Sequence, residues 1–289
     1  MTPVSPFSRR QALLASAAAT CTSFFDLPTF AISNGFADST DDAFGGLPMG
    51  VQSYSLRNFS LVEAVRHISG MGLKYVEFYS KHLNPGGPDQ QVQDVKELCK
   101  KAGISINAHG VSTFSKNHEN NGRIFEFAKR AGIKNLTANP QPDAFDSLER
   151  WCAKYKIRIC IHNHGPGSLY DKISDVTKAV KGRHPLIGAC VDTGHFIRSQ
   201  EDPVQAVHQL KGRVFALHVK DEEKREKRSK NVIIGTGHLD LVGLFQSLRD
   251  TEFPADGSVS LEYEANPNNP IDDIKQCIVQ AQAAISKLK

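Results

Sequence analysis

Hydrophobic residues recur along the chain in two alternating patterns from about residue 50 onward. Short apolar or alternating runs predict strands, and longer stretches with apolar residues at helical spacing lie between them. The predicted strands cover residues 50–55, 75–79, 104–109, 133–138, 157–161, 187–191, 214–217 and 259–261. The predicted helices include residues 61–71, 90–102, 143–156, 171–182, 201–211, 240–251 and 271–288. This alternation indicates parallel strands, because a parallel connection needs a crossover of about a dozen residues.

The number of these units selects the fold. Eight strand–helix units over about 240 residues match a (β/α)8 TIM barrel, which typically needs about 250 residues. We therefore predict a single α/β barrel domain over residues 46–289. A doubly wound open sheet is the competing fold, but it would use fewer strands, and no glycine-rich phosphate loop follows the first strand.

The last four predicted strands each end in a residue that can bind a metal. His162, Asp192, His218 and Glu262 follow directly after these apolar runs. In a TIM barrel the carboxyl ends of all strands meet at one mouth, where active sites lie. Imidazole and carboxylate groups together suit a divalent transition metal. The sequence thus predicts a metal site at the mouth.

Other polar residues are predicted to reach the same mouth. His109 ends the third strand and shares a strand face with Asn107, so we expect it to point inward and contact substrate. A structural histidine is the alternative. Glu77, in the second strand, is a candidate acceptor for a substrate hydroxyl. Lys220 lies two residues after His218, where it can stabilise a developing oxyanion, and a structural ion pair is its alternative role.

Composition and charge narrow the class of partner. Apolar residues make up 40% and charged residues 23% of the 289, with a net charge of +4, as in ordinary globular proteins. The one dense basic run, residues 224–230, also contains an acidic residue and is interpreted as a solvated loop. We therefore expect no nucleic-acid partner and no membrane span. The five cysteines beyond residue 45 show no paired spacing and predict no disulfide framework.

The first 45 residues do not belong to the predicted barrel. Arg9 and Arg10 precede a short uncharged apolar stretch at residues 12–20, which is too short to span a membrane. The paired arginines resemble a twin-arginine export signal, which sends folded proteins across a bacterial membrane. We predict that residues 1–45 form a signal peptide and linker, and that the protein is periplasmic or extracellular. An ordinary N-terminal tail is the alternative.

Several motifs resemble those of one known family. They are Val191-Asp-Thr-Gly-His195, Leu217-His-Val-Lys-Asp221, Ile234-Gly-Thr-Gly-His238, Leu261-Glu-Tyr-Glu264 and the opening strand Val51-Gln-Ser-Tyr-Ser55. Together they resemble the sugar phosphate isomerase/epimerase family of xylose isomerase-like TIM barrels. The resemblance covers roughly residues 48–288.

The resemblance implies a divalent cation, often manganese, bound by Glu, Asp, His and Glu from strands five to eight. In that family the two glutamates also exchange protons with the substrate on opposite faces of an enediolate. Asp192, His218 and Glu262 match this pattern. His162-Asn-His164 stands where Glu-Asn-His is expected, so we predict that His162 replaces the first glutamate as ligand. One Mn²⁺ ion is expected, with Co²⁺, Mg²⁺ or Zn²⁺ as alternatives.

This departure broadens the expected chemistry, because only Glu262 remains as an obvious metal-bound carboxylate base. The predicted function is isomerisation or epimerisation of a small sugar or sugar derivative by proton abstraction next to a carbonyl. β-Elimination, as in keto-glycoside lyases of this superfamily, is one alternative, and a non-catalytic carbohydrate-binding barrel is another. A DNA-repair-like phosphodiesterase is disfavoured because no basic surface is predicted. The sequence does not decide whether the protein forms a homo-oligomer. The predicted catalytic groups are Glu262, His164 and Lys220, and the predicted substrate-binding groups are His109, His195 and Glu77.

Overall fold

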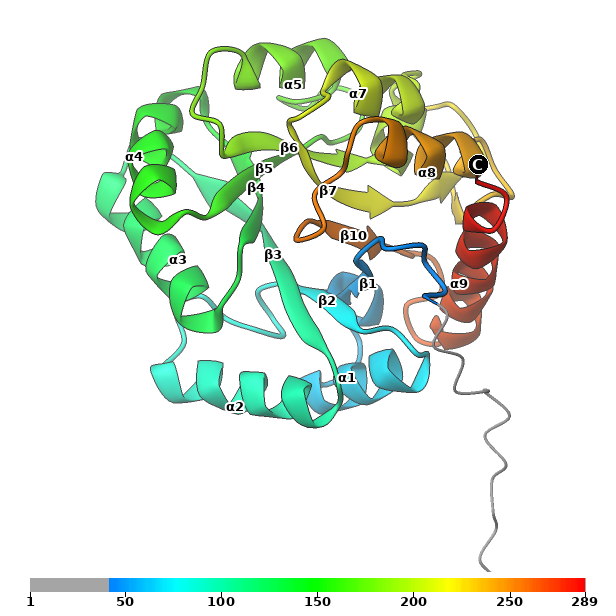
Figure 1. The fold of residues 1–289 in the computed structure, drawn as a ribbon, viewed down its shortest axis with the longest axis horizontal. Helices are drawn as coiled ribbons and strands as arrows, with labels where there is room; N and C mark the ends of the chain where they lie inside the picture. Colours follow the sequence, from blue (N-terminus) through cyan, green and yellow to red (C-terminus); the bar gives the residue numbers. More distant parts are fainter. Residues whose placement is uncertain (1–41, 289) are drawn as a thin grey trace, which may run out of the picture. The chain divides into compact units, whose positions relative to one another are not determined.

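The computed structural model describes residues 42–288, and this part of the chain forms a closed barrel of eight parallel strands surrounded by helices (Figure 1). The strands, in order around the barrel, are β1 (Met49–Gln52), β2 (Tyr75–Phe78), β3 (Ser105–Phe114), β4 (Asn135–Pro140), β5 (Arg158–His162), β6 (Ile187–Asp192), β7 (Val214–Val219) and β10 (Ser258–Leu261). The outer helices are α1 (Leu61–Gly70), α2 (Asp89–Lys101), α3 (His118–Ala131), α4 (Phe145–Tyr155), α5 (Ile173–Val180), α7 (Pro203–Gln209), α8 (Leu241–Asp250) and α9 (Ile271–Ile285). The predicted (β/α)8 barrel is confirmed. The predicted leader falls almost entirely on residues 1–41, outside the described range.

Local sequence signals set where the helices begin and end. Ser60 and Glu63 form a reciprocal capping box at the start of α1. Asp240 accepts a hydrogen bond from the Gly243 N–H and caps α8 in the same way as the Ser60 side chain caps α1. Gly132 ends α3 with φ of 77°, a left-handed conformation that glycine adopts without steric conflict. These ends allow the short loops that return the chain to the barrel.

The barrel wall has two different faces. Ile159, Ile161 and Val191 belong to the large core that the strands form with the helices. Cys160 and Cys190 lie between these residues in sequence and belong to a separate small cluster, together with Phe215 and Ala216. Side chains alternate along a strand, so Cys160, Cys190 and Ala216, which pair across β5, β6 and β7 through Gly188 and Cys190, point into the barrel interior. The register shift after Ala189 makes Phe215 an extra residue in β7, and Phe215 joins the same cluster. The small residues that precede the carboxyl ends of the strands leave room in the interior for polar side chains at the mouth.

Strand register brings the predicted ligands to one level. Asp192 pairs with His218 across β6 and β7, and His218 pairs with Ser260, two residues before Glu262. His162 pairs with Cys190, two residues before Asp192. Since residues two apart share a strand face, these side chains enter the same end of the interior.

Further short elements surround the mouth, and the sequence prediction lacks them. α6 (Thr193–Arg198) begins directly after Asp192, whose side chain accepts a hydrogen bond from the His195 N–H at 2.8 Å and caps the helix. β8 (Asp221–Glu222) and β9 (Asn231–Val232) form an antiparallel hairpin, and its connecting loop contains the basic run at residues 224–230. Two 3₁₀ turns, η1 (Ser53–Leu56) and η2 (Pro142–Ala144), follow β1 and β4.

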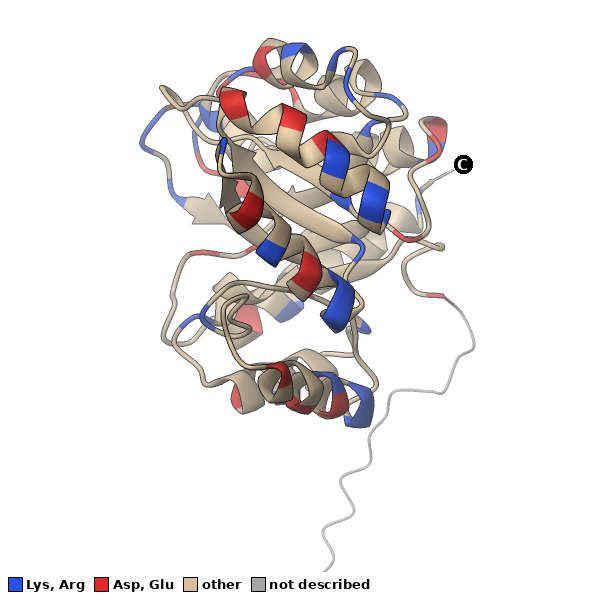
Figure 2. Cartoon of the chain, turned by 90° about the vertical axis from the view of Figure 1, so that its left-hand side faces the viewer, with Lys and Arg blue, Asp and Glu red and all other residues tan. Residues whose placement is uncertain are grey.

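The surface carries charges of both signs. Figure 2 shows basic and acidic residues interspersed along the helices that face the viewer. Residues 223–228 are exposed, as predicted for a solvated loop. Among residues 42–288, no helix is long and apolar enough to cross a membrane.

Candidate metal centre and active site

Four side chains converge at the mouth of the barrel. Donor atoms of His162, Asp192, His218 and Glu262 all lie within 4.8 Å of one another. His162 Nε2 is 3.2 Å from Asp192 Oδ2 and 3.0 Å from His218 Nδ1, which is itself 3.0 Å from Glu262 Oε2. All four residues are buried. The structure thus brings together the four residues that the sequence predicts as metal ligands.

This donor set fits a divalent transition metal. Atoms bound tetrahedrally at 2.0–2.2 Å from one ion lie about 3.3–3.6 Å apart, close to the spacings found here. Glu262 Oε2 lies 3.0 Å from both His218 Nδ1 and Lys220 Nζ, so the Lys220 ammonium group is its ion-pair partner. His218 Nδ1 and His162 Nε2 lie only 3.0 Å apart, and two imidazole nitrogens at this distance beside two carboxylates suit a shared cation.

Glu77 holds His218 in a fixed orientation within the cluster. Glu77 Oε2 lies 3.0 Å from His218 Nε2 and accepts a hydrogen bond from Ser260 Oγ at 2.9 Å. Glu77 Oε1 accepts one from Thr137 Oγ1 at 2.5 Å. A proton on His218 Nε2 leaves the Nδ1 lone pair directed at the other ligands, the usual carboxylate–histidine–metal arrangement. Glu77 is fully buried, so the structure places it behind His218 rather than at an exposed position for substrate.

The segment from His162 to His164 places its three side chains differently. His162 directs Nε2 at the ligand cluster, and its Nδ1 is 3.4 Å from Nδ1 of His164. Asn163 ties two strand ends together, since it accepts a hydrogen bond from the Asp192 N–H at 2.8 Å and donates one to the Asp192 carbonyl at 2.9 Å. His164 is partly exposed, and burial together with the charge of His162 lowers its pKa to about 4. His164 is therefore neutral near pH 7 and can accept a proton.

Lys220 extends its ammonium group into the same cluster. Its Nζ is 3.2 Å from Asp192 Oδ2 and 3.0 Å from Glu262 Oε2, and it donates a hydrogen bond to Glu264. Burial favours the neutral amine, but Asp192, Glu262 and Glu264 outweigh it and raise the pKa of Lys220 well above its ordinary value. A permanent positive charge therefore lies beside the predicted base.

His195 lies at the partly exposed edge of the cluster. Its ring stacks on His164 at a centroid distance of 5.3 Å and meets His162 edge-on at 5.5 Å. His195 Nε2 is 3.9 Å from Asp192 Oδ2, and its Nδ1 contacts the guanidinium group of Arg198, a residue that the sequence prediction lacks. This position is compatible with the predicted substrate-binding role.

His109 is not brought into the cluster. The pairing of β2 with β3 shifts by one residue after Val76, where β3 contributes the extra residue Asn107. Such a shift sends every later side chain to the opposite face. The His109 ring accordingly packs on Phe127 of α3 at 5.0 Å, and its Nε2 lies 2.8 Å from the Leu83 carbonyl oxygen. The predicted inward orientation is not observed, so a role in substrate binding stays a prediction without a supporting contact.

Asp221 anchors the loop between β9 and α8. Its carboxylate accepts hydrogen bonds of 2.8–2.9 Å from the backbone N–H groups of residues 222, 235, 237, 238 and 239. These bonds hold the Gly235–His238 segment against the end of β7. The His-x-Lys-Asp motif therefore serves two purposes, because Lys220 enters the site and Asp221 shapes the loop beside it.

The closed barrel and its cluster of donors at the carboxyl mouth define a class of TIM barrel with a candidate metal site. Within that class, the model of one family, the xylose isomerase-like TIM barrel, matches residues 65–279. The chain belongs to this family.

Similar proteins include curated enzymes and solved structures. Inosose dehydratase of Geobacillus kaustophilus is 24% identical over an alignment of 154 residues, and the match covers 47% of this chain and 49%, or about half, of that enzyme. Inosose dehydratase of Mesomycoplasma hyopneumoniae is 21% identical over 218 residues, covering 68% of this chain and 71% of the enzyme. The structure of an uncharacterized protein of Parabacteroides distasonis has 29% identity and a TM-score of 0.64, covering 81% of this chain and 98% of its own. The structure of 3-keto-D-glucoside 4-epimerase from E. coli shares the fold at 18% identity and a TM-score of 0.64, covering 82% and 99% of the two chains.

Proposed function

We propose that this protein is a metal-dependent enzyme that removes a proton from a carbon next to the carbonyl group of a sugar or cyclic polyol ketone. The position of Glu262 Oε2 carries the proposal. This atom is buried and lies 3.0 Å from both His218 Nδ1 and the Lys220 ammonium group, within the cluster of four possible metal ligands. Membership in the family, and relatives named as a dehydratase and an epimerase, support the same class of chemistry.

The residues of the mouth divide the work of such a reaction. The four clustered side chains would hold a divalent cation, which supplies a Lewis acid for the substrate carbonyl. Glu262 accepts the proton from the neighbouring carbon, and the electrons of the C–H bond form the enediolate double bond. Lys220 stabilises the developing oxyanion through its charge. His164, neutral and partly exposed, is placed to exchange a proton on another side of the substrate.

His162 in place of a second glutamate favours reactions that need one carboxylate base. Isomerisation returns the proton from Glu262 to the adjacent carbon. β-Elimination instead expels a group from the next carbon, and the proton that Glu262 has removed can pass to that departing group. Epimerisation needs a base on each face, and His164 would have to be the second one. We therefore place isomerisation and elimination before epimerisation.

Proton exchange tests this proposal before the reaction subtype is known. The purified protein, reconstituted with Mn²⁺ or Co²⁺, is incubated in D2O with inosose and 3-keto-glucosides while NMR follows the hydrogens next to each carbonyl. We expect deuterium incorporation or a new product with the wild type and neither with Glu262→Gln. Equal exchange in both proteins would contradict the role of Glu262. Binding of these ketones by a protein that takes up no metal would favour the non-catalytic barrel instead.

We also propose that residues 1–45 direct export, supported by the paired arginines before an apolar stretch. An exported enzyme would meet unphosphorylated sugars. Fractionation of bacterial cells that express the full chain tests this proposal. The double variant Arg9→Lys, Arg10→Lys should retain the protein in the cytoplasm, and an unchanged distribution would contradict the assignment.

A further inference from the structure

A second group of histidines lies beside the proposed metal ligands. Nitrogen atoms of His162, His164 and His195 lie within 4.8 Å of one another, and only His162 is shared with the four-residue cluster. The two nitrogens of the shared ring face different neighbours. His162 Nε2 faces Asp192, whereas Nδ1 faces His164. His164 and His195 are partly exposed, so an ion from solution can reach them.

The spacing of these rings suits ligands of a single ion. His162 Nδ1 and His164 Nδ1 are 3.4 Å apart, and two nitrogens bound tetrahedrally to Zn²⁺ at 2.0–2.1 Å lie about 3.3–3.4 Å apart. The His195 ring lies nearly parallel to His164, with 27° between the planes, and nearly perpendicular to His162, at 89°. Imidazole lone pairs lie in the ring plane, so the nearly parallel His164 and His195 rings do not converge as they stand, and one of these partly exposed rings must rotate to direct three nitrogens at one position.

We propose that His162, His164 and His195 bind a second cation, bridged to the first by the His162 ring. An all-imidazole site suits Zn²⁺, Co²⁺ or Cu²⁺ better than Mg²⁺ or Ca²⁺. Binding through both ring nitrogens requires His162 to release its remaining N–H proton to solvent, so that a bridging imidazolate forms. This inference rests on His162 as a ligand of the first ion in the proposed function and adds a second ion to it.

The Arg198 side chain lies next to the proposed second site. Its guanidinium group contacts His195 Nδ1, and its side chain is 24% exposed. Arg198 Nε and Glu222 Oε2 are both buried without a hydrogen-bond partner, and Arg198 Nε lies 3.9 Å from Glu222 Oε1. A rotation of the guanidinium group toward Glu222 would pair these atoms and free His195 Nδ1 for an ion. Removal of the Arg198 charge should therefore strengthen binding at the second site.

Metal titration of the full-length protein tests the proposal. After removal of metal with a chelator, Zn²⁺ binding is measured by calorimetry and by elemental analysis of the dialysed protein. We expect two equivalents in the wild type and one in His164→Ala and in His195→Ala. The exposed histidine on α7, replaced in His208→Ala, is the matched control and should leave two equivalents. Arg198→Met should bind the second equivalent more tightly than the wild type.

Each outcome separates the second site from the first. One equivalent in the wild type overturns the second site and leaves the proposed function standing, whereas none overturns both. Two equivalents in both His164→Ala and His195→Ala would place the extra ion elsewhere and overturn the proposal. Circular dichroism checks folding, and glutamine variants replace any alanine variant that does not fold. Anomalous diffraction from Zn²⁺-loaded wild-type crystals should show two peaks flanking His162, and a single peak would overturn the bridge.

Discussion

The two ends of the barrel use polar residues in opposite ways. At the amino-terminal end, Asn135 donates hydrogen bonds to the backbone carbonyls of residues 107 and 256, and Arg158 lies 2.7 Å from the Asp256 carboxylate. These groups meet opposite charges or backbone acceptors. At the mouth, the Asp192 and Glu262 carboxylates lie together beside two imidazoles and a single lysine. The first arrangement stabilises a fold, and the second prepares a site for a ligand.

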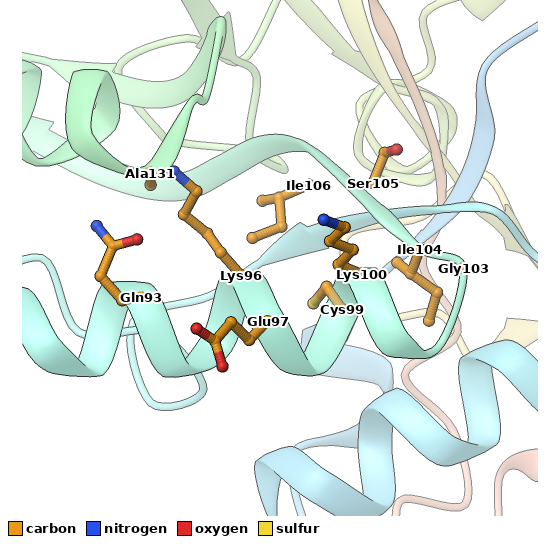
Figure 3. Close-up of a pocket in the computed structure, with 10 residues that line it drawn as sticks. All are labelled: Gln93, Lys96, Glu97, Cys99, Lys100, Gly103, Ile104, Ser105, Ile106 and Ala131. Atoms are coloured by element: carbon orange, nitrogen blue, oxygen red, sulfur yellow. The ribbon is translucent and has the colours of Figure 1, made fainter.

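A hollow near the amino-terminal end sharpens this comparison. It measures about 600 Å³ and opens between α2 and the start of β3 (Figure 3). Lys96 and Lys100 line it from α2, and burial raises the pKa of the neighbouring Cys99 thiol to about 12. Neither candidate metal group among the described residues includes a residue of this hollow. Strongly shifted charges in one place therefore mark the functional end better than volume does.

The largest effect is expected when the same substitution is made at each end. Asp192→Asn removes the charge of a proposed metal ligand, so metal affinity and the exchange rate should fall by more than about a hundredfold. Asp256→Asn, at the opposite end, should leave both unchanged. Elemental analysis and exchange in D2O measure the two quantities. If Asp256→Asn impairs exchange as strongly as Asp192→Asn, the assignment of function to the mouth is wrong.

Lys220 should affect the rate more than it affects metal binding. Lys220→Met removes the ammonium group that lies 3.0 Å from Glu262 but keeps the length of the side chain. The loss of oxyanion stabilisation should lower kcat by about 10²–10³-fold with metal content unchanged. Lys134→Met is the matched control, because Lys134 pairs with Asp256 at 3.1 Å and should not influence kcat. Loss of the metal in Lys220→Met would instead indicate a structural ion pair.

Glu77 should act on metal affinity through His218. Glu77→Gln removes the negative charge opposite His218 Nε2, and loss of such a partner typically lowers metal affinity about 10–100-fold. Excess metal should then restore kcat. Competition with a chelating dye measures the affinity, and Glu97→Gln at the hollow serves as control. An unchanged affinity with a raised KM would return Glu77 to the substrate-binding role predicted from sequence.

The sequence could predict the proposed metal ligands but not the residues that hold Glu77 in place behind them. His162, Asp192, His218 and Glu262 each follow an apolar run, so chain position alone indicates the shared mouth. The groups that hold Glu77 in place are not readable in this way. Thr137 and Ser260 come from strands far apart in sequence, and only the closed barrel brings them to one carboxylate. Long-range pairing of this kind leaves no local pattern.

The remaining errors arise where a local pattern is interrupted or used twice. The extra residue Asn107 reverses the period of two in β3 and turns His109 away from the interior. Asp192 is both a predicted ligand and the cap of α6, and the second role went unpredicted because the helix is short. The available signal for this helix was Asp192 itself, because aspartate is a favoured residue at the start of a helix.

The smallest expected effect is on the pH dependence of folding stability, through Asp256 at the amino-terminal end of the barrel. Burial alone would raise the pKa of Asp256, but hydrogen bonds from Arg158 and Lys134 outweigh it and lower the pKa below the ordinary value of 3.8. A carboxylate with a lowered pKa in the folded state stabilises the fold above pH 3.8, and this stabilisation is lost as the pH falls through the folded-state value. The Asp256 side chain is 45% exposed, so solvent screening should limit the effect to less than about 1 kcal/mol, or about 2–4 °C in Tm. Asp256→Asn should therefore melt slightly below the wild type at pH 7, and the two should converge on acidification. A difference that widens in acid would show that the ionised form is not the stabilising one, and the amino-terminal end would no longer be the electrostatically satisfied half of the comparison.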